Sequence, residues 1–169
     1  MKKLVVSAMI ALMAVGSSFA QKYALIDMEY IFSRIPSYEM ANEQLNQISK
    51  KWQAEVDALA KEAKEMYAKY QSEMVYLSAE MKKTKENEIL AKEKEVSDLN
   101  RKYFGSEGEL YKKRESLLAP IQDEVYNAVK SLAEEKGYVL ILDRASGVNI
   151  VFASPTIDVS EDVLKKMGY

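Results

Sequence analysis

The side chains that most often carry catalysis are missing from this sequence. Its 169 residues include no histidine and no cysteine, which removes the commonest general base, the commonest metal ligand and every thiolate nucleophile. Asp27 and Asp143 each follow a predicted strand, and neighbouring carboxylates can divide acid and base roles. Helix capping and turn formation are the favoured interpretation of both. We therefore predict no enzymatic activity, no catalytic residue, no metal site and no cofactor.

Methionine and tyrosine side chains suggest a different chemistry, the binding of apolar surface. Methionine adapts to irregular surfaces, and tyrosine combines apolar area with a polar hydroxyl. We predict that six such residues contact an unfolded chain: Met66, Tyr67, Tyr70, Met74, Tyr76 and Met81. The alternative, that they only join two helices to each other, is favoured for Met66 and Tyr70.

These six residues lie within a long segment, residues 37–118, that is predicted to be helical. It contains no proline, and its apolar residues recur in steps of three and four, the heptad pattern of a coiled coil. The apolar positions are Tyr38, Ala41, Leu45, Ile48, Trp52, Val56, Leu59, Ala63, Met66, Tyr70, Met74 and Leu77, then Ile89, Val96, Leu99, Tyr103, Leu110 and Leu117. The pattern predicts two helices that pack along a narrow seam.

A turn near Ser78 would separate two arms of equal length. Ser78 is a good N-cap, and residues 37–77 and 79–118 form arms of 41 and 40 residues. At a rise of 1.5 Å per residue each arm measures about 60 Å. Equal arms indicate an antiparallel hairpin, although a single uninterrupted helix stays open because neither glycine nor proline marks the tip. Gly105 and Gly108 predict either a flexible point in the second arm or tolerated surface positions.

Both ends of the chain outside the hairpin are predicted to form one small body. Residues 23–26 and 138–142 are expected strands, and Val148 to Phe152 is the expected partner of the second. Pro120 is expected to end the second arm and begin a new helix, and Ser160 to cap a last one. The fold class is thus α+β: a long antiparallel coiled-coil hairpin, residues 37–118 with its tip near 78, inserted in a small β-rich body of residues 22–36 and 119–169.

This body has about 66 residues, too few to bury much apolar surface alone. Its strands are apolar on both faces, so we expect subunits to associate through it. The residues predicted to mediate this oligomerisation are Leu25, Ile26, Leu140, Ile141, Leu142, Ile150 and Phe152.

The first 20 residues are typical of a secretory signal peptide. Lys2 and Lys3 precede an apolar run at residues 4–15, and Ser18 and Ala20 are the small residues that a signal peptidase requires. We predict cleavage after Ala20; an uncleaved anchor is the less favoured alternative. Cleavage removes two lysines and leaves 22 basic against 26 acidic residues. A net negative chain argues against general nucleic-acid binding.

Four motifs resemble the Skp/OmpH family of periplasmic chaperones over essentially the whole mature chain. They are ALIDMEYIF at residues 24–32, LAPI at 118–121, EKGYVLILD at 135–143 and IDVSEDVL at 157–164. The resemblance implies a homotrimer in the periplasm, whose helical arms enclose unfolded outer-membrane β-barrel proteins without ATP. Well-known members are strongly basic and contact lipopolysaccharide. Here the arms carry 15 basic and 16 acidic residues, so we expect weak or no lipopolysaccharide contact.

One alternative function belongs to another class. The chain could be an exported coiled-coil adaptor or spacer of the cell envelope that docks to a single folded partner. Such proteins usually flank a hairpin with further β-rich domains, and this chain has room for one small body. A holdase would suppress the aggregation of several unrelated unfolded proteins, whereas an adaptor would bind one folded protein.

Overall fold

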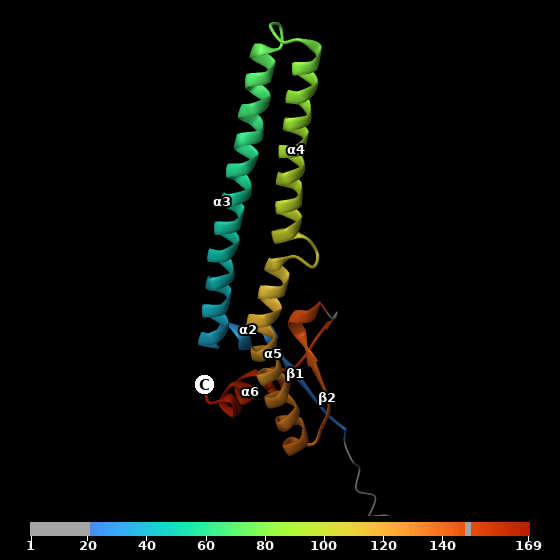
Figure 1. The fold of residues 1–169 in the computed structure, drawn as a ribbon. Coiled ribbons are helices and arrows are strands. Elements are labelled where there is room, and N and C mark those ends of the chain that lie inside the picture. The colour runs from blue at the N-terminus through green and yellow to red at the C-terminus, as the bar shows by residue number, and fades with distance from the viewer. Residues whose placement is uncertain (1–20, 148–149) are drawn as a thin grey trace, which may run out of the picture. The chain divides into compact units, whose positions relative to one another are not determined.

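The computed structural model describes residues 21–147 and 150–169, so the predicted signal peptide lies outside the described residues. In chain order the elements are β1 (Lys22–Ile26), α2 (Met28–Ser33), α3 (Pro36–Glu73), α4 (Ala79–Phe104), α5 (Glu109–Lys136), β2 (Tyr138–Asp143), the 3-10 turns η1 (Arg144–Ser146) and η2 (Pro155–Ile157), and α6 (Ser160–Met167) (Figure 1). Long helices accompany a two-stranded sheet, which confirms the α+β class.

The described chain divides into two compact units. One contains residues up to 31 together with residues 128–168, and the other contains residues 32–127. The sequence placed these divisions after residue 36 and before residue 119.

The first unit is organised by a parallel pair of strands. β1 pairs with β2 so that Ala24 lies beside Ile141 and Ile26 beside Asp143. The apolar residues Ala24, Leu25 and Ile26 of β1 are all buried. An isolated bridge joins Leu25 to Asp158, and the N–H of Val159 donates to the carbonyl of Leu25 at 2.8 Å. The C-terminal segment therefore covers the free edge of β1.

Among the described residues, none after β2 forms the predicted hairpin partner strand. Residues 148 and 149 lie outside the described residues, and residues 150–152 are not a strand. Instead, β2 continues into η1, where the Asp143 carboxylate accepts the N–H of Ala145 at 2.9 Å, and Gly147 ends the turn with φ 77°. This side-chain cap turns the backbone away from the extended path that a tight hairpin needs.

The second unit contains the predicted helical hairpin. Proline begins α3 at Pro36, as expected, and α3 runs for 38 residues before the chain turns at residues 74–78. The Ser78 hydroxyl caps α4 by accepting the N–H of Met81 at 3.3 Å. The helical hairpin is thus confirmed, its turn lies at residues 74–78, and the alternative of one uninterrupted helix is wrong.

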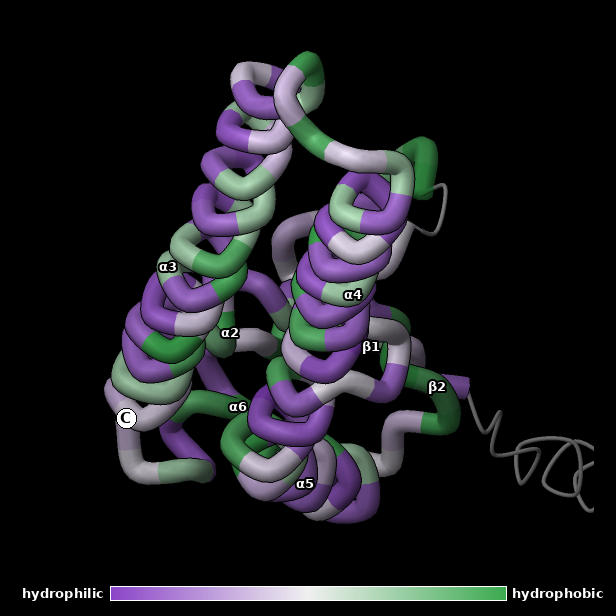
Figure 2. Tube along the Cα trace, turned by 45° about the horizontal axis from the view of Figure 1, so that its top comes forward, coloured by the Kyte–Doolittle hydropathy of each residue, from purple (hydrophilic) through white to green (hydrophobic). Residues whose placement is uncertain are grey.

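The heptad positions form the least exposed line along both arms. Ala41, Leu45, Val56 and Ala63 are buried on α3, and Ile89 is buried on α4. Hydrophobic positions recur between hydrophilic ones along each helix (Figure 2). These buried positions form the narrow seam that the heptad repeat predicted.

The second arm is interrupted at its glycines, and not at its proline. α4 ends at Phe104 and α5 begins at Glu109, with Gly105 and Gly108 in the intervening turn. A Cβ atom on Gly105 would lie 2.4 Å from the Arg101 carbonyl oxygen, so this path requires glycine. Both glycines therefore serve a specific turn and are not tolerated surface substitutions.

Pro120 lies inside α5, so the predicted helix boundary at this residue is wrong. Leu118, Ile121 and Val125 are all buried and lie three and four residues apart, on one helix face. Burial of this continuous face outweighs the cost of an interior proline, which is about 3 kcal/mol in an isolated helix.

Replacing Pro120 tests this account. Pro120→Ala restores an N–H that can donate to the Ser116 carbonyl and removes the ring clash, so the free energy of unfolding should rise by about 1–3 kcal/mol. Urea unfolding followed by circular dichroism measures the change. Ser131→Ala, at an exposed position of the same helix, is the control and should gain only a few tenths of a kcal/mol. A loss of stability in Pro120→Ala would contradict the structure.

Candidate functional site

Polar and aromatic contacts hold the two arms of the hairpin in register. The rings of Trp52 and Tyr103 stack with centroids 4.7 Å apart, and the Tyr103 hydroxyl donates to Glu55 at 2.6 Å, which raises the pKa of Tyr103. Lys92 pairs with Glu62 at 3.4 Å, nearer the tip. Because these groups are exposed or only partly buried, each contact adds only modestly to the stability that the seam provides. Together they matter in a two-helix unit that has little core.

The six predicted contact residues fall into two groups. Met66 and Tyr70 are partly buried on the seam. The Tyr70 hydroxyl donates to Glu86 on the other arm, and this hydrogen bond raises the pKa of Tyr70. Their role in joining the helices, which the sequence favoured for these two, therefore fits their contacts.

The other four predicted residues are exposed. Tyr67 is 49 % exposed, Met74 41 %, Tyr76 89 % and Met81 51 %. Three of them lie at or next to the turn between α3 and α4 (Figure 1). Val75 is 80 % exposed in the same turn and was missed. The signal for it was present, since Met74 to Leu77 is an unbroken apolar run at a helix break.

The residues predicted to mediate oligomerisation also divide by exposure. Leu25 and Ile26 are buried within their own unit, whereas Leu140, Leu142 and Phe152 are 46 %, 36 % and 85 % exposed. Ile141 and Ile150 are intermediate. Two further exposed residues were not selected, Val139 and Val151. They extend the same apolar runs, so the sequence contained the signal for them.

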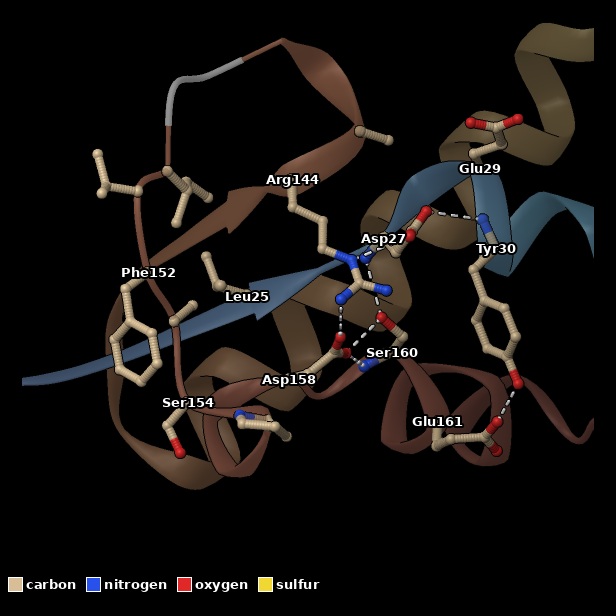
Figure 3. Close-up of a pocket in the computed structure, with 15 residues that line it drawn as sticks. Leu25, Asp27, Glu29, Tyr30, Arg144, Phe152, Ser154, Asp158, Ser160 and Glu161 are labelled. Atoms are coloured by element: carbon tan, nitrogen blue, oxygen red, sulfur yellow. Dashed lines mark hydrogen bonds and ion pairs between the residues drawn. The ribbon is translucent and has the colours of Figure 1, made fainter.

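The two candidate acid–base residues do approach each other in the first unit, as caps. The Asp143 carboxylate accepts the N–H of Met28 at 3.1 Å, while that of Asp27 accepts the N–H of Tyr30 at 2.8 Å. Arg144 then donates to Asp27 at 2.9 Å (Figure 3). The carboxylates are thus satisfied by the backbone and by a guanidinium, which fits the favoured interpretation that they form turns.

Arg144 and Ser160 join three segments of this unit. Arg144 also pairs with Asp158 at 3.2 Å. The Ser160 hydroxyl donates to Asp158 at 2.6 Å and accepts the N–H of Asp27 at 2.9 Å. Ser160 does not cap α6, as had been predicted, because its hydroxyl is used in this network and the N-cap is Val159.

A cavity of about 890 Å³ adjoins this network. Its lining includes the polar residues Arg144 and Asp158 and the apolar residues Val151 and Phe152. Figure 3 shows Arg144 directed toward Asp158, and the ring of Phe152. Residues 21–147 and 150–169 hold no cluster of three acidic side chains that could bind a metal ion. No helix in these ranges is both long enough and apolar enough to cross a membrane.

Comparisons with known proteins agree with one another. The model of the family described as outer membrane protein (OmpH-like) matches residues 22–167. Two relatives are each named chaperone protein Skp. That of Yersinia enterocolitica is 28 % identical over 160 residues, which cover 94 % of this chain and 93 % of the relative. That of Pectobacterium atrosepticum is 23 % identical over 171 residues and 99 % of each chain.

A solved structure also resembles this chain. It is the crystal structure of a protein from Caulobacter crescentus described as an OmpH-like outer membrane chaperone. The TM-score is 0.66 at 11 % identity, over 87 % of this chain and 83 % of the other. At this identity the likeness shows a shared fold.

The carboxylate network predicts a pH-dependent stability. The N–H of Tyr30 and the guanidinium of Arg144 hold the pKa of Asp27 below its ordinary value of 3.8. A depressed pKa adds stability that is present above pH 3.8 and is lost as the pH falls through the folded-state pKa. Asp27→Asn keeps a capping oxygen but loses the charge, so it should cost on the order of 1 kcal/mol at pH 7.

Thermal unfolding of the two proteins between pH 7 and pH 2.5 measures this difference. The difference in unfolding temperature between the parent and Asp27→Asn should disappear below pH 3.8, when Asp27 itself becomes protonated. Asp123→Asn, on the exposed side of α5, should change little at either pH. A gap that is equally wide at pH 2.5 would show that the charge of Asp27 is not the cause.

Proposed function

Since the chain belongs to the family of OmpH-like outer membrane proteins, we propose that it acts in the periplasm as a holdase chaperone. Family membership supports a chaperone role, and the family is not one of enzymes. In the proposed function, the chain binds unfolded outer-membrane β-barrel proteins in a cavity between helical arms and prevents their aggregation. It uses no ATP and no metal, and its first 20 residues are removed on export.

The observation that carries this proposal is the exposed apolar turn of the hairpin. Tyr76 and Val75 are 89 % and 80 % exposed, beside Met74 and Met81. Exposed apolar groups that lie close together mark interaction surfaces. Methionine and tyrosine suit a surface that must bind many sequences. The flexible methionine side chain repacks easily, and tyrosine offers both apolar and polar contact.

Assembly through the small body is part of the proposal. Leu140, Val151 and Phe152 expose apolar side chains in a unit that has no disulfide to stabilise it. Covering them with other copies of the chain would supply the burial that a small unit lacks. A homotrimer, the state that the resemblance implies, is the proposed assembly, and it would set three hairpins around one client.

The alternative of an adaptor or spacer is not proposed. None of the matches described above favours it, whereas both Skp relatives are named as chaperones.

The proposed assembly has a direct test. Sedimentation equilibrium of the mature chain at micromolar concentration should give the mass of a trimer, and Leu140→Asp with Phe152→Asp should shift it toward monomer. Burying two unpaired carboxylates in an interface is strongly unfavourable. Ser131→Asp with Gln122→Asp, at exposed positions of α5, is the control and should leave the mass unchanged. A stable, folded monomer of the parent would contradict the proposed trimer.

The way in which the chain binds a client can be tested by changing the salt concentration and by replacing the four exposed residues. Exposed charges are screened over about 8 Å at physiological salt, whereas apolar contacts are not. The client dissociation constant should therefore change little between roughly 0.05 and 0.5 M salt. The combined change of Tyr67, Met74, Tyr76 and Met81 to serine should weaken binding, by about 1 kcal/mol for each apolar side chain that is replaced.

The readout is aggregation and binding of a urea-unfolded outer-membrane β-barrel protein. The control replaces Met40, Tyr111 and Tyr126 by serine, since these are also exposed but lie away from the turn. It should bind like the parent. A steep loss of binding with salt, together with an unaffected quadruple variant, would mean that lysines hold the client.

A further inference from the structure

Three polar contacts that cross between the arms lie on one side of the hairpin. On α3 they use Glu55, Glu62 and Glu73, and on α4 they use Tyr103, Lys92 and Lys85. Both sets are spaced by seven and eleven residues, and both steps return to the same side of a helix with 3.6 residues per turn. One lateral face is thus closed by cross-arm contacts.

The opposite lateral face carries a groove, and the Tyr70–Glu86 hydrogen bond crosses between the arms one heptad nearer the tip. Its walls are Ala60, Ala63, Lys64 and Tyr67 on α3, with Glu93 and Val96 on α4, and its volume is about 280 Å³. A step of two residues turns about 200° around a helix. Lys64 therefore faces away from Glu62, and Leu90, which is 61 % exposed, faces away from Lys92.

The groove combines an apolar floor with a donor and an acceptor at its rim. Ala60 and Ala63 leave the space that larger side chains would fill, and Tyr67, a residue that is 49 % exposed, forms one wall. Lys64 and Glu93 make no ion pair or hydrogen bond with any described residue. One ammonium and one carboxylate are therefore free beside an apolar depression.

We infer that this groove holds an extended segment of unfolded polypeptide, with one large apolar side chain seated between Ala60 and Tyr67. An extended chain has unpaired backbone groups, whereas a helix satisfies its own. The Lys64 ammonium can donate to such a carbonyl, and the Glu93 carboxylate can accept from such an N–H. This complementarity favours an unfolded client over a folded, helical partner. The inference rests on the proposed holdase function and names the surface that performs it.

Filling the groove tests the inference without removing any charge. Ala60→Leu places a larger side chain in the depression and should raise the client dissociation constant about threefold to tenfold, because one apolar client side chain is displaced. Ala58→Leu makes the same change two residues away, at an exposed position outside the groove. It should bind a urea-unfolded outer-membrane β-barrel protein like the parent. Helicity and melting temperature should match in all three proteins.

Photocrosslinking locates the client independently of affinity. A benzophenone amino acid at Leu90, on the groove face, should form adducts with the unfolded client, and the same probe at Glu88 should form few. Equal yields at both positions would overturn the inference. Adducts from Leu90 to a second copy of the chain, in place of the client, would also overturn it by showing that a neighbouring subunit covers the groove.

Different results would refute the groove inference and the proposed holdase function. If the parent holds the client and Ala60→Leu holds it equally well, the groove is not its binding surface and the holdase function stands. If the parent fails to keep any unfolded outer-membrane β-barrel protein from aggregating, the holdase function falls, and the inference falls with it.

Discussion

Parallel pairing of β1 with β2 constrains the path of the chain that connects the two strands. The register sets Ile26 beside Asp143, although more than a hundred residues separate them along the chain. Adjacent parallel strands need a crossover connection, and here that connection contains the whole hairpin. The chain must therefore leave β1, reverse direction once and return, which requires a first arm balanced by a second. α3 has 38 residues, and α4 needs the beginning of α5 to match it.

The hairpin achieves this with very little core. Its buried side chains form one line, so a small rotation of either helix would expose them. Cross-arm contacts such as the Trp52–Tyr103 stack resist that rotation from one side. On the opposite side the Tyr70–Glu86 hydrogen bond crosses between the arms near the tip, and a groove lies between the helices next to it. The two lateral faces of this thin coiled coil therefore differ.

Regular features of this fold could be predicted because each depends on local chemistry. The heptad repeat predicted the seam, Pro36 the start of α3, and Ser78 the cap of α4. Features decided by distant contacts could not be predicted. Pro120 stays helical because burial of Leu118 and Ile121 outweighs its intrinsic cost. Ser160 was expected to cap a helix, yet its hydroxyl accepts the N–H of Asp27, which is distant in sequence, and donates to the nearby Asp158.

The candidate site shows the same division. Exposed tyrosine and methionine near the helix break could be read from the sequence, because apolar residues there have few neighbours to bury them. The lateral groove could not be predicted from the sequence, since alanine has high helix propensity and its presence in a helix indicates no specific role. Only the packing of α3 against α4 shows that Ala60 and Ala63 leave room beside Tyr67.

Charged residues along the arms limit which of their surfaces can bind other proteins. A coiled coil with exposed apolar residues tends to associate with itself, and mixed charges around those residues oppose this. The arms carry 15 basic and 16 acidic residues, so in the proposed function they would neither attract nor repel a client as a whole. Discrimination would then arise at short range, where an apolar side chain meets an apolar depression and backbone groups meet free charges. A folded protein has already buried its apolar side chains and paired its backbone, and it cannot offer either contact. In the proposed function, selectivity for the unfolded state would follow from what that state exposes, without any need for sequence recognition or an energy source.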